Sequence, residues 1–176
     1  MGLAMAQQLL KPHHTVVCIA RHSNPDLTAA AMASDVALEQ WQQDLSRGQA
    51  AAEHLQTWLK KQAPDAFTSA TLINNAGVIP RITPLSDSDP ADLANALRVG
   101  LEAPMQLTAA FLHATADWAV PRKVLNISSG LGRRAMASQA ALFSVAIDSM
   151  TSRASSSVTS SRLSAVPQIP VPTGLV

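Results

Sequence analysis

Three short apolar runs, separated by stretches of helical periodicity, constrain the fold of this chain more than any other feature of its sequence. The runs cover residues 16–20, 71–73 and 124–127, and each is too short for a helix. Continuous apolar runs of this length are typical of parallel strands that are buried on both faces. Strands that alternate with helices form βαβ units with right-handed crossovers. The sequence therefore predicts an α/β protein with a doubly wound parallel sheet in a three-layer sandwich.

Helical periodicity fills much of the chain around these runs. No capping residue precedes Gly2, so the first helix is already under way where the sequence begins. Gly100 and Pro104 weaken the middle of the longest helical stretch. The segment from Val36 to Leu45 alternates too poorly to be assigned. Apolar residues recur at helical spacing in residues 2–10, 48–62 and 90–113.

Charge and cysteine content exclude several classes of protein. Lys and Arg total 13 against 12 Asp and Glu, and the pI is about 8.0, which argues against the basic stripe of a nucleic-acid-binding protein. The single Cys cannot form an internal disulfide, and the sequence begins without the features of a signal peptide. No apolar run approaches the roughly 18 residues of a membrane span. We therefore expect a cytoplasmic protein that binds neither nucleic acid nor a membrane.

The side chains that often bind metals or stack on bases are scattered along the chain. His13 and His14 form a pair in a turn, but no Cys or carboxylate stands at metal-ligand spacing from them. We therefore predict no metal site. Trp41, Trp58 and Trp118 are too far apart in the sequence for a stacking platform, and we assign them to packing.

Five short motifs follow one another in an order that is more informative than any of them alone. They are Gly2-Leu3-Ala4 at a helix start, Arg21 after a strand, Asp44-Leu45, Asn74-Asn75-Ala76-Gly77 after a strand, and Asn126-Ile127-Ser128-Ser129-Gly130. In this order and at these separations the chain resembles the short-chain dehydrogenase/reductase family, of Rossmann type, over about residues 2–141. The resemblance implies a partial NADP-binding domain over residues 1–141 that lacks the first and the last strands of the family's sheet.

The resemblance also places an NADP site along the carboxyl ends of the strands. Gly2 matches the last glycine of the turn that, with the helix N-terminus, binds the pyrophosphate. Because the rest of that turn is missing, NADP binding is expected to be weak or lost. Arg21 stands where a basic residue favours the 2′-phosphate of NADP, and an exposed strand-end Arg is the alternative.

Two further motifs would contact the adenosine half of the cofactor. In the pair Asp44-Leu45, the carboxylate would accept a hydrogen bond from the adenine amine, and a surface carboxylate at a helix start is an equal alternative. The backbone of Asn74, Ala76 and Gly77 would line the ribose. A purely structural turn is the alternative here, and the two roles are compatible.

Only one of the family's four catalytic positions carries the expected group. Ser129 matches the serine that orients the substrate carbonyl, and Ser128 is its less favoured neighbour. Leu142 stands in place of the proton-donating Tyr, Ala146 in place of the Lys, and Gly100 in place of the Asn. The chain contains no Tyr, so it has no phenol that could donate the proton by which the family's general acid catalysis proceeds.

The composition of the chain changes at the position of the absent Tyr. Residues 142–176 include nine Ser, three Pro and only three charged residues. Such a segment has little apolar surface with which to offset its ordering entropy. We therefore predict that residues 142–176 are a tail that is disordered or translated in a shifted reading frame, and that the start codon is placed late.

Two functions follow from these observations. One is an NADP-dependent oxidoreductase that reduces a carbonyl or oxidises an alcohol of a small-molecule substrate. The other is a catalytically inactive fragment that is at most a weak nucleotide-binding or partner-binding module. Because the missing first strand lies at the centre of the family's sheet, two inner strand edges would be left unpaired. The chain is therefore expected to be unstable or to form homo-oligomers.

Overall fold

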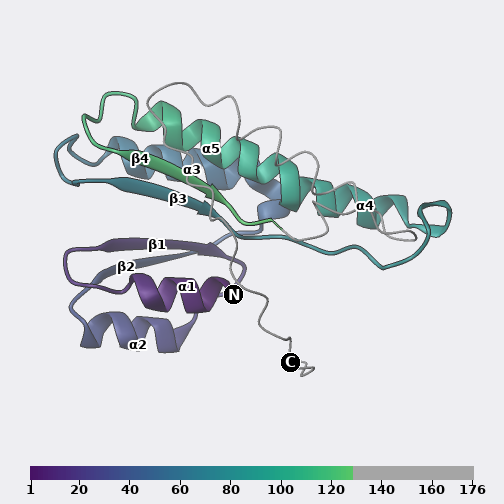
Figure 1. Ribbon diagram of the computed structural model, residues 1–176, viewed down its shortest axis with the longest axis horizontal. Coiled ribbons are helices and arrows are strands. Elements are labelled where there is room, and N and C mark those ends of the chain that lie inside the picture. Colours follow the sequence, from purple (N-terminus) through teal and green to yellow (C-terminus); the bar gives the residue numbers. More distant parts are fainter. Residues whose placement is uncertain (129–176) are drawn as a thin grey trace, which may run out of the picture.

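The computed structural model describes residues 1–128, so the predictions for Ser129 and for residues 142–176 lie outside the described part (Figure 1). Five α-helices and four strands alternate along this part of the chain, as the apolar pattern predicts. In chain order the elements are α1 (Gly2–Leu9), β1 (Thr15–Ala20), α2 (Pro25–Ala33), β2 (Ala37–Gln42), α3 (Gly48–Lys60), β3 (Ala70–Asn74), α4 (Pro90–Leu97), α5 (Ala103–Ala114) and β4 (Arg122–Asn126).

The strands form two parallel pairs. β1 pairs with β2 from Thr15 opposite Ala37 to Ala20 opposite Gln42. β3 pairs with β4 over its full length. Within residues 1–128 neither β1 nor β3 has a strand on its other edge. The predicted parallel α/β architecture is therefore confirmed, and the described sheet is an incomplete form of it.

One layer of helices covers both strand pairs. α3 and α5 pack against each other, and Val17 of β1, Leu72 of β3 and Val124 of β4 all pack against the core that the two helices share. Val16 is buried, and because neighbouring side chains of a strand point to opposite faces it lies on the other side of the sheet. α1 contacts β1 on that second side, and α2 contacts β2 (Figure 1). The shared core consists of Trp41, Ala51, Ala52, Leu55, Leu59, Leu107, Phe111 and Trp118.

The structure corrects two expectations about the strands. The unassigned segment from Val36 to Leu45 contains β2, whose exposed residues are Ala37, Glu39 and Gln42 and whose only buried member is Trp41. β1 was expected to be buried on both faces, but Val16 is its only buried residue. The physical reason is that, in the described part, only one edge of β1 is covered by a neighbouring strand.

Two of the tryptophans lie together despite their separation in the sequence. The rings of Trp41 and Trp58 meet edge to face, with centroids 5.9 Å apart. The carboxylate of Glu39 accepts hydrogen bonds from both indole N–H groups, at 2.8 Å and 2.7 Å. The expectation that the tryptophans are far apart is therefore wrong for this pair, while their assignment to packing is confirmed.

The long helical stretch from residue 90 onward is interrupted by one π-helical turn, Arg98–Glu102, between α4 and α5. Pro104 lies in the first turn of α5, lacks an N–H and would clash with the carbonyl group of Gly100 in a regular helix. The wider turn removes that clash. Turns of this kind are frequent at functional sites. No helix within residues 1–128 is both long and apolar enough to cross a membrane.

Candidate functional site

The residues predicted to bind a nucleotide follow the carboxyl ends of the strands. Arg21 directly follows β1, Asp44 is the second residue after β2, and Asn74 is the last residue of β3. In each parallel pair the carboxyl ends of the two strands lie at the same edge. This edge is the one at which open parallel sheets bind their ligands.

The N-terminus of α1 lies against the loop that follows β3. A Cβ atom placed on Gly2 would approach Nδ2 of Asn75 to 2.8 Å. α1 therefore begins beside the Asn74–Gly77 segment, as the predicted site requires. The helix start brings unpaired backbone N–H groups to this place.

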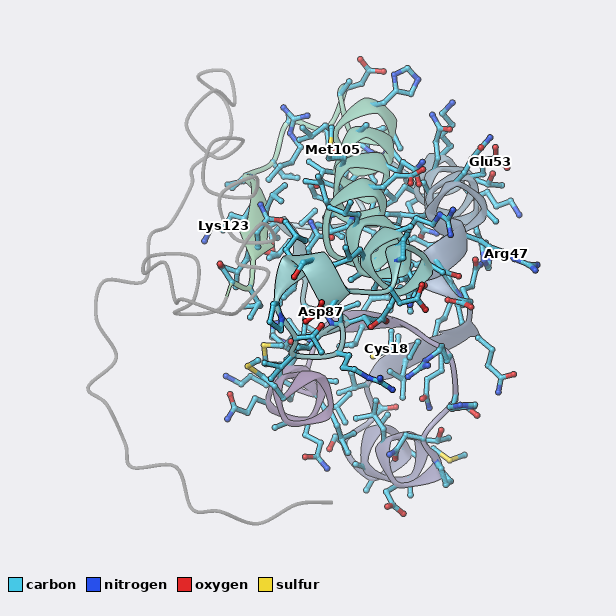
Figure 2. The ribbon with its side chains drawn as sticks, turned by 90° about the vertical axis from the view of Figure 1, so that its right-hand side faces the viewer. Cys18, Arg47, Glu53, Asp87, Met105 and Lys123 are labelled. Atoms are coloured by element: carbon cyan, nitrogen blue, oxygen red, sulfur yellow. The ribbon has the colours of Figure 1, made fainter. Side chains whose placement is uncertain are left out.

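Arg21 and Asp44 follow the neighbouring parallel strands β1 and β2. Hydrogen bonds from Ser46, whose backbone N–H donates to Oδ1 of Asp44 at 2.9 Å, lower the pKa of the Asp44 carboxyl group. The charges of Arg21 and Arg47 lower that pKa further. Arg47 points into solvent in Figure 2. Within residues 1–128 no hydrogen-bond acceptor is bound to the Arg21 guanidinium, so its donors are available to a ligand.

Asp44 and Leu45 also have structural roles. Asp44 caps the 3₁₀ turn Leu45–Arg47. This is the alternative role given above, a surface carboxylate at the start of a helix. Leu45 packs against the shared core. The carboxylate of Asp44 is exposed, so the cap leaves it accessible to a further donor. Its contact with an adenine amine stays a prediction.

The side chain of Asn74 is committed to the sheet. It is 8% exposed, and its Nδ2 donates to Oδ1 of Asn126 at 2.8 Å and to Oγ1 of Thr108 at 3.2 Å. The carbonyl oxygen of Asn74 accepts a hydrogen bond from the N–H of Ile127 at 2.9 Å. Asn74 therefore connects β3 to β4 and α5, and its side chain is not available to a ligand.

The loop after β3 has two features that fit a nucleotide. Oδ1 of Asn75 is buried and has no hydrogen-bond partner in the described part of the chain. A ribose hydroxyl is a donor of the kind that such an acceptor needs. A Cβ placed on Gly77 would meet nothing within 4 Å, so the backbone there is open to close approach, and Ala76 beside it is exposed. The residues present therefore fit the adenosine and ribose parts of NADP.

The catalytic positions lie mostly beyond the described residues. Ser128 is the last described residue, and Ser129, Leu142 and Ala146 follow it. Gly100 lies in the π-helical turn and contributes no side chain. The structure thus places Gly2 beside Asn75, and Arg21 within electrostatic reach of Asp44. The predicted catalytic serine, Ser129, lies outside the described residues.

Other chemistry-bearing groups are few in the described part. No group of three or more His, Cys, Asp or Glu side chains within residues 1–128 could hold a metal ion. Cys18, which is labelled in Figure 2, lies in β1 and is half-buried. Burial raises the pKa of its thiol, which keeps it protonated and unreactive.

Sequence reasoning missed three groups at this edge of the sheet. They are the Asn75 acceptor, the side chain of Asn126 and a pair of glutamines in β2, Gln40 and Gln42. Polar side chains inside a strand are the signal that could have found the glutamines, because they need partners when the strand is packed.

Comparison with known proteins gives consistent matches. The family model for short chain dehydrogenases matches residues 1–156. A benzil reductase ((S)-benzoin forming) of Bacillus cereus is 32% identical over 133 residues, which are 76% of this chain and 53% of that protein. The chain therefore spans about half the length of the curated relative it matches.

Two solved structures extend the similarity to the fold. A short-chain dehydrogenase/reductase from Burkholderia vietnamiensis aligns with a TM-score of 0.75 and 30% identity, over 96% of this chain and 80% of that one. A metagenomic short-chain oxidoreductase in complex with NADP aligns with a TM-score of 0.70 and 28% identity, over 89% and 73%.

Proposed function

Because the chain belongs to the short chain dehydrogenase family, we propose that its site binds NADP and serves the reduction of a carbonyl or the oxidation of an alcohol. The observation that carries the proposal is the position of Arg21, directly after β1 and close enough to Asp44 to lower the pKa of its carboxyl group. A guanidinium is a preferred partner of a phosphate group. At the end of this strand it selects for the 2′-phosphate, which NAD lacks.

The remaining residues would each bind one part of the cofactor. Asp44 would accept a hydrogen bond from the adenine amine, and the exposed backbone of Ala76 and Gly77 would line a ribose. Asn75 would accept from a ribose hydroxyl through its unpartnered Oδ1. NADPH, when bound, supplies the hydride to the carbonyl carbon. Ser129 would donate a hydrogen bond to the carbonyl oxygen and orient the substrate.

The name of the relative from Bacillus cereus suggests a substrate class. Benzil is an aromatic 1,2-diketone, and a related small-molecule diketone is the first substrate we propose to test. The small-molecule substrate would then be this diketone in the reduction, or the corresponding hydroxyketone in the oxidation. The complex of the metagenomic relative with NADP agrees with the choice of cofactor.

A second candidate function is binding without catalysis. Leu142 and Ala146 stand where the family resemblance expects the Tyr and the Lys. Neither side chain carries a proton that could be donated to the substrate oxygen, which is the role of a general acid. For the chain as written we favour this second function, an inactive member that binds nucleotide weakly.

Fluorescence titration with NADPH and with NADH tests the proposal. We expect weak binding, a preference for NADPH, and loss of that preference in an Arg21→Leu variant. Equal affinity for the two cofactors in the unmodified chain would contradict the role of Arg21. Micromolar affinity for NADPH would contradict the expectation that binding is weakened.

A further inference from the structure

Two glutamines of β2 hold the loop that carries Arg21. Nε2 of Gln40 donates to the carbonyl oxygen of Asn24 at 3.0 Å and to Oγ1 of Thr28 at 2.8 Å. Oε1 of the same amide accepts from the N–H of Asn24 at 2.7 Å. One side chain thus binds both backbone groups of a single loop residue, as a neighbouring strand would.

The second glutamine holds the middle of the same loop. Nε2 of Gln42 donates to Oγ of Ser23 at 3.1 Å. The start of the loop is fixed by the backbone, because the N–H of Gln43 donates to the carbonyl oxygen of Ala20 at 2.8 Å. The loop from Arg21 to Asn24 is therefore tied to β2 at its beginning, middle and end.

The end of the loop is also the start of α2. Oδ1 of Asn24 accepts a hydrogen bond from the N–H of Leu27 at 2.9 Å and caps the helix. Because Gln40 fixes the backbone of Asn24, it fixes this cap as well. Residues 21–23 are exposed, and the glutamine hydrogen bonds to Ser23 and Asn24 restrain the loop at its middle and its end.

We propose that Gln40, assisted by Gln42, is a positioning residue that fixes the loop so that Arg21 faces a 2′-phosphate and so sets the preference for NADP over NAD. This inference rests on the proposed function. Without the glutamine contacts, the exposed loop would sample several conformations. The guanidinium of Arg21 would then pay an ordering cost on binding that it now avoids.

The test compares two nucleotides that differ at the 2′ position, adenosine 2′,5′-bisphosphate and adenosine 5′-monophosphate. Neither contains the pyrophosphate, so the turn before Gly2 does not enter the comparison. The variants are Gln40→Leu and the exposed-site variant Gln42→Ala. The matched control is Gln43→Leu. The side-chain amide of Gln43 contacts Nδ1 of His54 at 2.7 Å and not the loop, and the substitution keeps the backbone N–H that donates to Ala20.

We expect Gln40→Leu to lower the ratio of the two affinities about three- to tenfold, the order expected from losing one or two net hydrogen bonds. Affinity for adenosine 5′-monophosphate should stay within about twofold, because a general loss of structure would weaken both nucleotides alike. Gln42→Ala should lower the ratio by a smaller factor and keep the fold, since its side chain is exposed. Gln43→Leu should leave the ratio unchanged.

A second readout reports on the loop without any nucleotide. The charge of Arg21 contributes to the lowered pKa of Asp44, so release of the loop should raise that pKa, which NMR titration measures. An Arg21→Leu variant gives the upper reference. Equal binding of the two nucleotides by the unmodified chain would contradict the proposed function. A Gln40→Leu chain that discriminates as well as the unmodified chain, or that leaves the Asp44 titration unchanged, would overturn the positioning role.

Discussion

Nδ2 of Asn74 donates to Oδ1 of Asn126 at 2.8 Å, which joins the carboxyl ends of β3 and β4 at the last residue pair of their ladder. The same Nδ2 also reaches Oγ1 of Thr108 on α5. The loop that would line the ribose begins at the next residue, Asn75. The geometry of the proposed cofactor site therefore depends on a buried amide that does not itself contact the cofactor.

We predict that Asn74→Leu destabilises the chain by about 1–3 kcal/mol, because it removes a buried donor and leaves the half-buried acceptors of Thr108 and Asn126 without it. Urea unfolding followed by circular dichroism measures the change. Gln49→Ala is the control, since its amide makes only an exposed contact with Glu53 along α3. A variant as stable as the control would show that the amide pair contributes nothing.

The contact between α3 and α5 leads to a second prediction. A Cβ placed on Gly48 would lie 2.8 Å from the Cα and Cβ atoms of Ala103, far inside contact distance. Gly48→Ala should therefore cost about 1–3 kcal/mol through overpacking, despite the better helix propensity of alanine. Gly77→Ala is the matched control, because its Cβ would meet no atom within 4 Å. If both variants lower the thermal midpoint equally, helix packing is not the cause.

The Asp44 carboxylate gives a prediction about pH. Its pKa is lowered in the folded chain by the hydrogen bonds from Ser46 and by the charges of Arg21 and Arg47. The stabilisation is therefore fully present above the unfolded pKa, near 4, and is lost as the pH falls through the lower folded pKa. Thermal midpoints of the unmodified chain and of Asp44→Asn should differ at neutral pH and converge toward pH 2. A difference that stays constant across this range would exclude Asp44 as the cause.

Local signals explain why much of the fold could be predicted from the sequence. The apolar run at residues 71–73 and the apolar stripe over residues 48–62 are clear local patterns, so β3 and α3 appear close to their predicted bounds. The tight turn predicted after the run is instead an irregular loop. β2 was left unassigned because the segment that contains it alternates poorly. Its polar residues Glu39, Gln40 and Gln42 find partners in the indole of Trp58 and in the loop after β1, which lie elsewhere in the chain and which no local pattern contains.

The candidate site was only partly predictable for the same reason. Arg21 stands out because it follows a predicted strand, whereas Asp44 stands out only through the Asp-Leu pair of the family resemblance. The parallel pairing of β1 and β2 then puts the ends that carry them at the same edge. The orphan acceptor of Asn75 depends on where α1 begins in space, some seventy residues earlier in the chain. The Asn74–Asn126 pair likewise depends on strand register, which a single sequence does not specify.

The free edges of β1 and β3 give a fourth prediction. Within residues 1–128 each of these strands pairs on one side only, so its other edge presents unsatisfied N–H and C=O groups. We expect the chain to be oligomeric or to unfold without a cooperative transition. Size-exclusion chromatography with far-UV circular dichroism measures both properties. A compact monomer that melts cooperatively would contradict this expectation.

The last prediction concerns catalysis. We expect no measurable reductase activity with aldehydes, ketones or diketones, benzil included, at saturating NADPH. A positioned proton donor contributes typically about 10²–10⁴-fold to the rate, and Leu142 cannot act as one. Ala146 cannot supply the positive charge of the Lys, so orientation of the cofactor is lost in addition. Ser129 alone can only polarise the carbonyl.

The assay compares the unmodified chain with a Leu142→Tyr, Ala146→Lys double variant, and turnover by the unmodified chain would refute the prediction. Activity in the double variant alone would show that the two side chains, rather than the incomplete sheet, are what the chain lacks for catalysis.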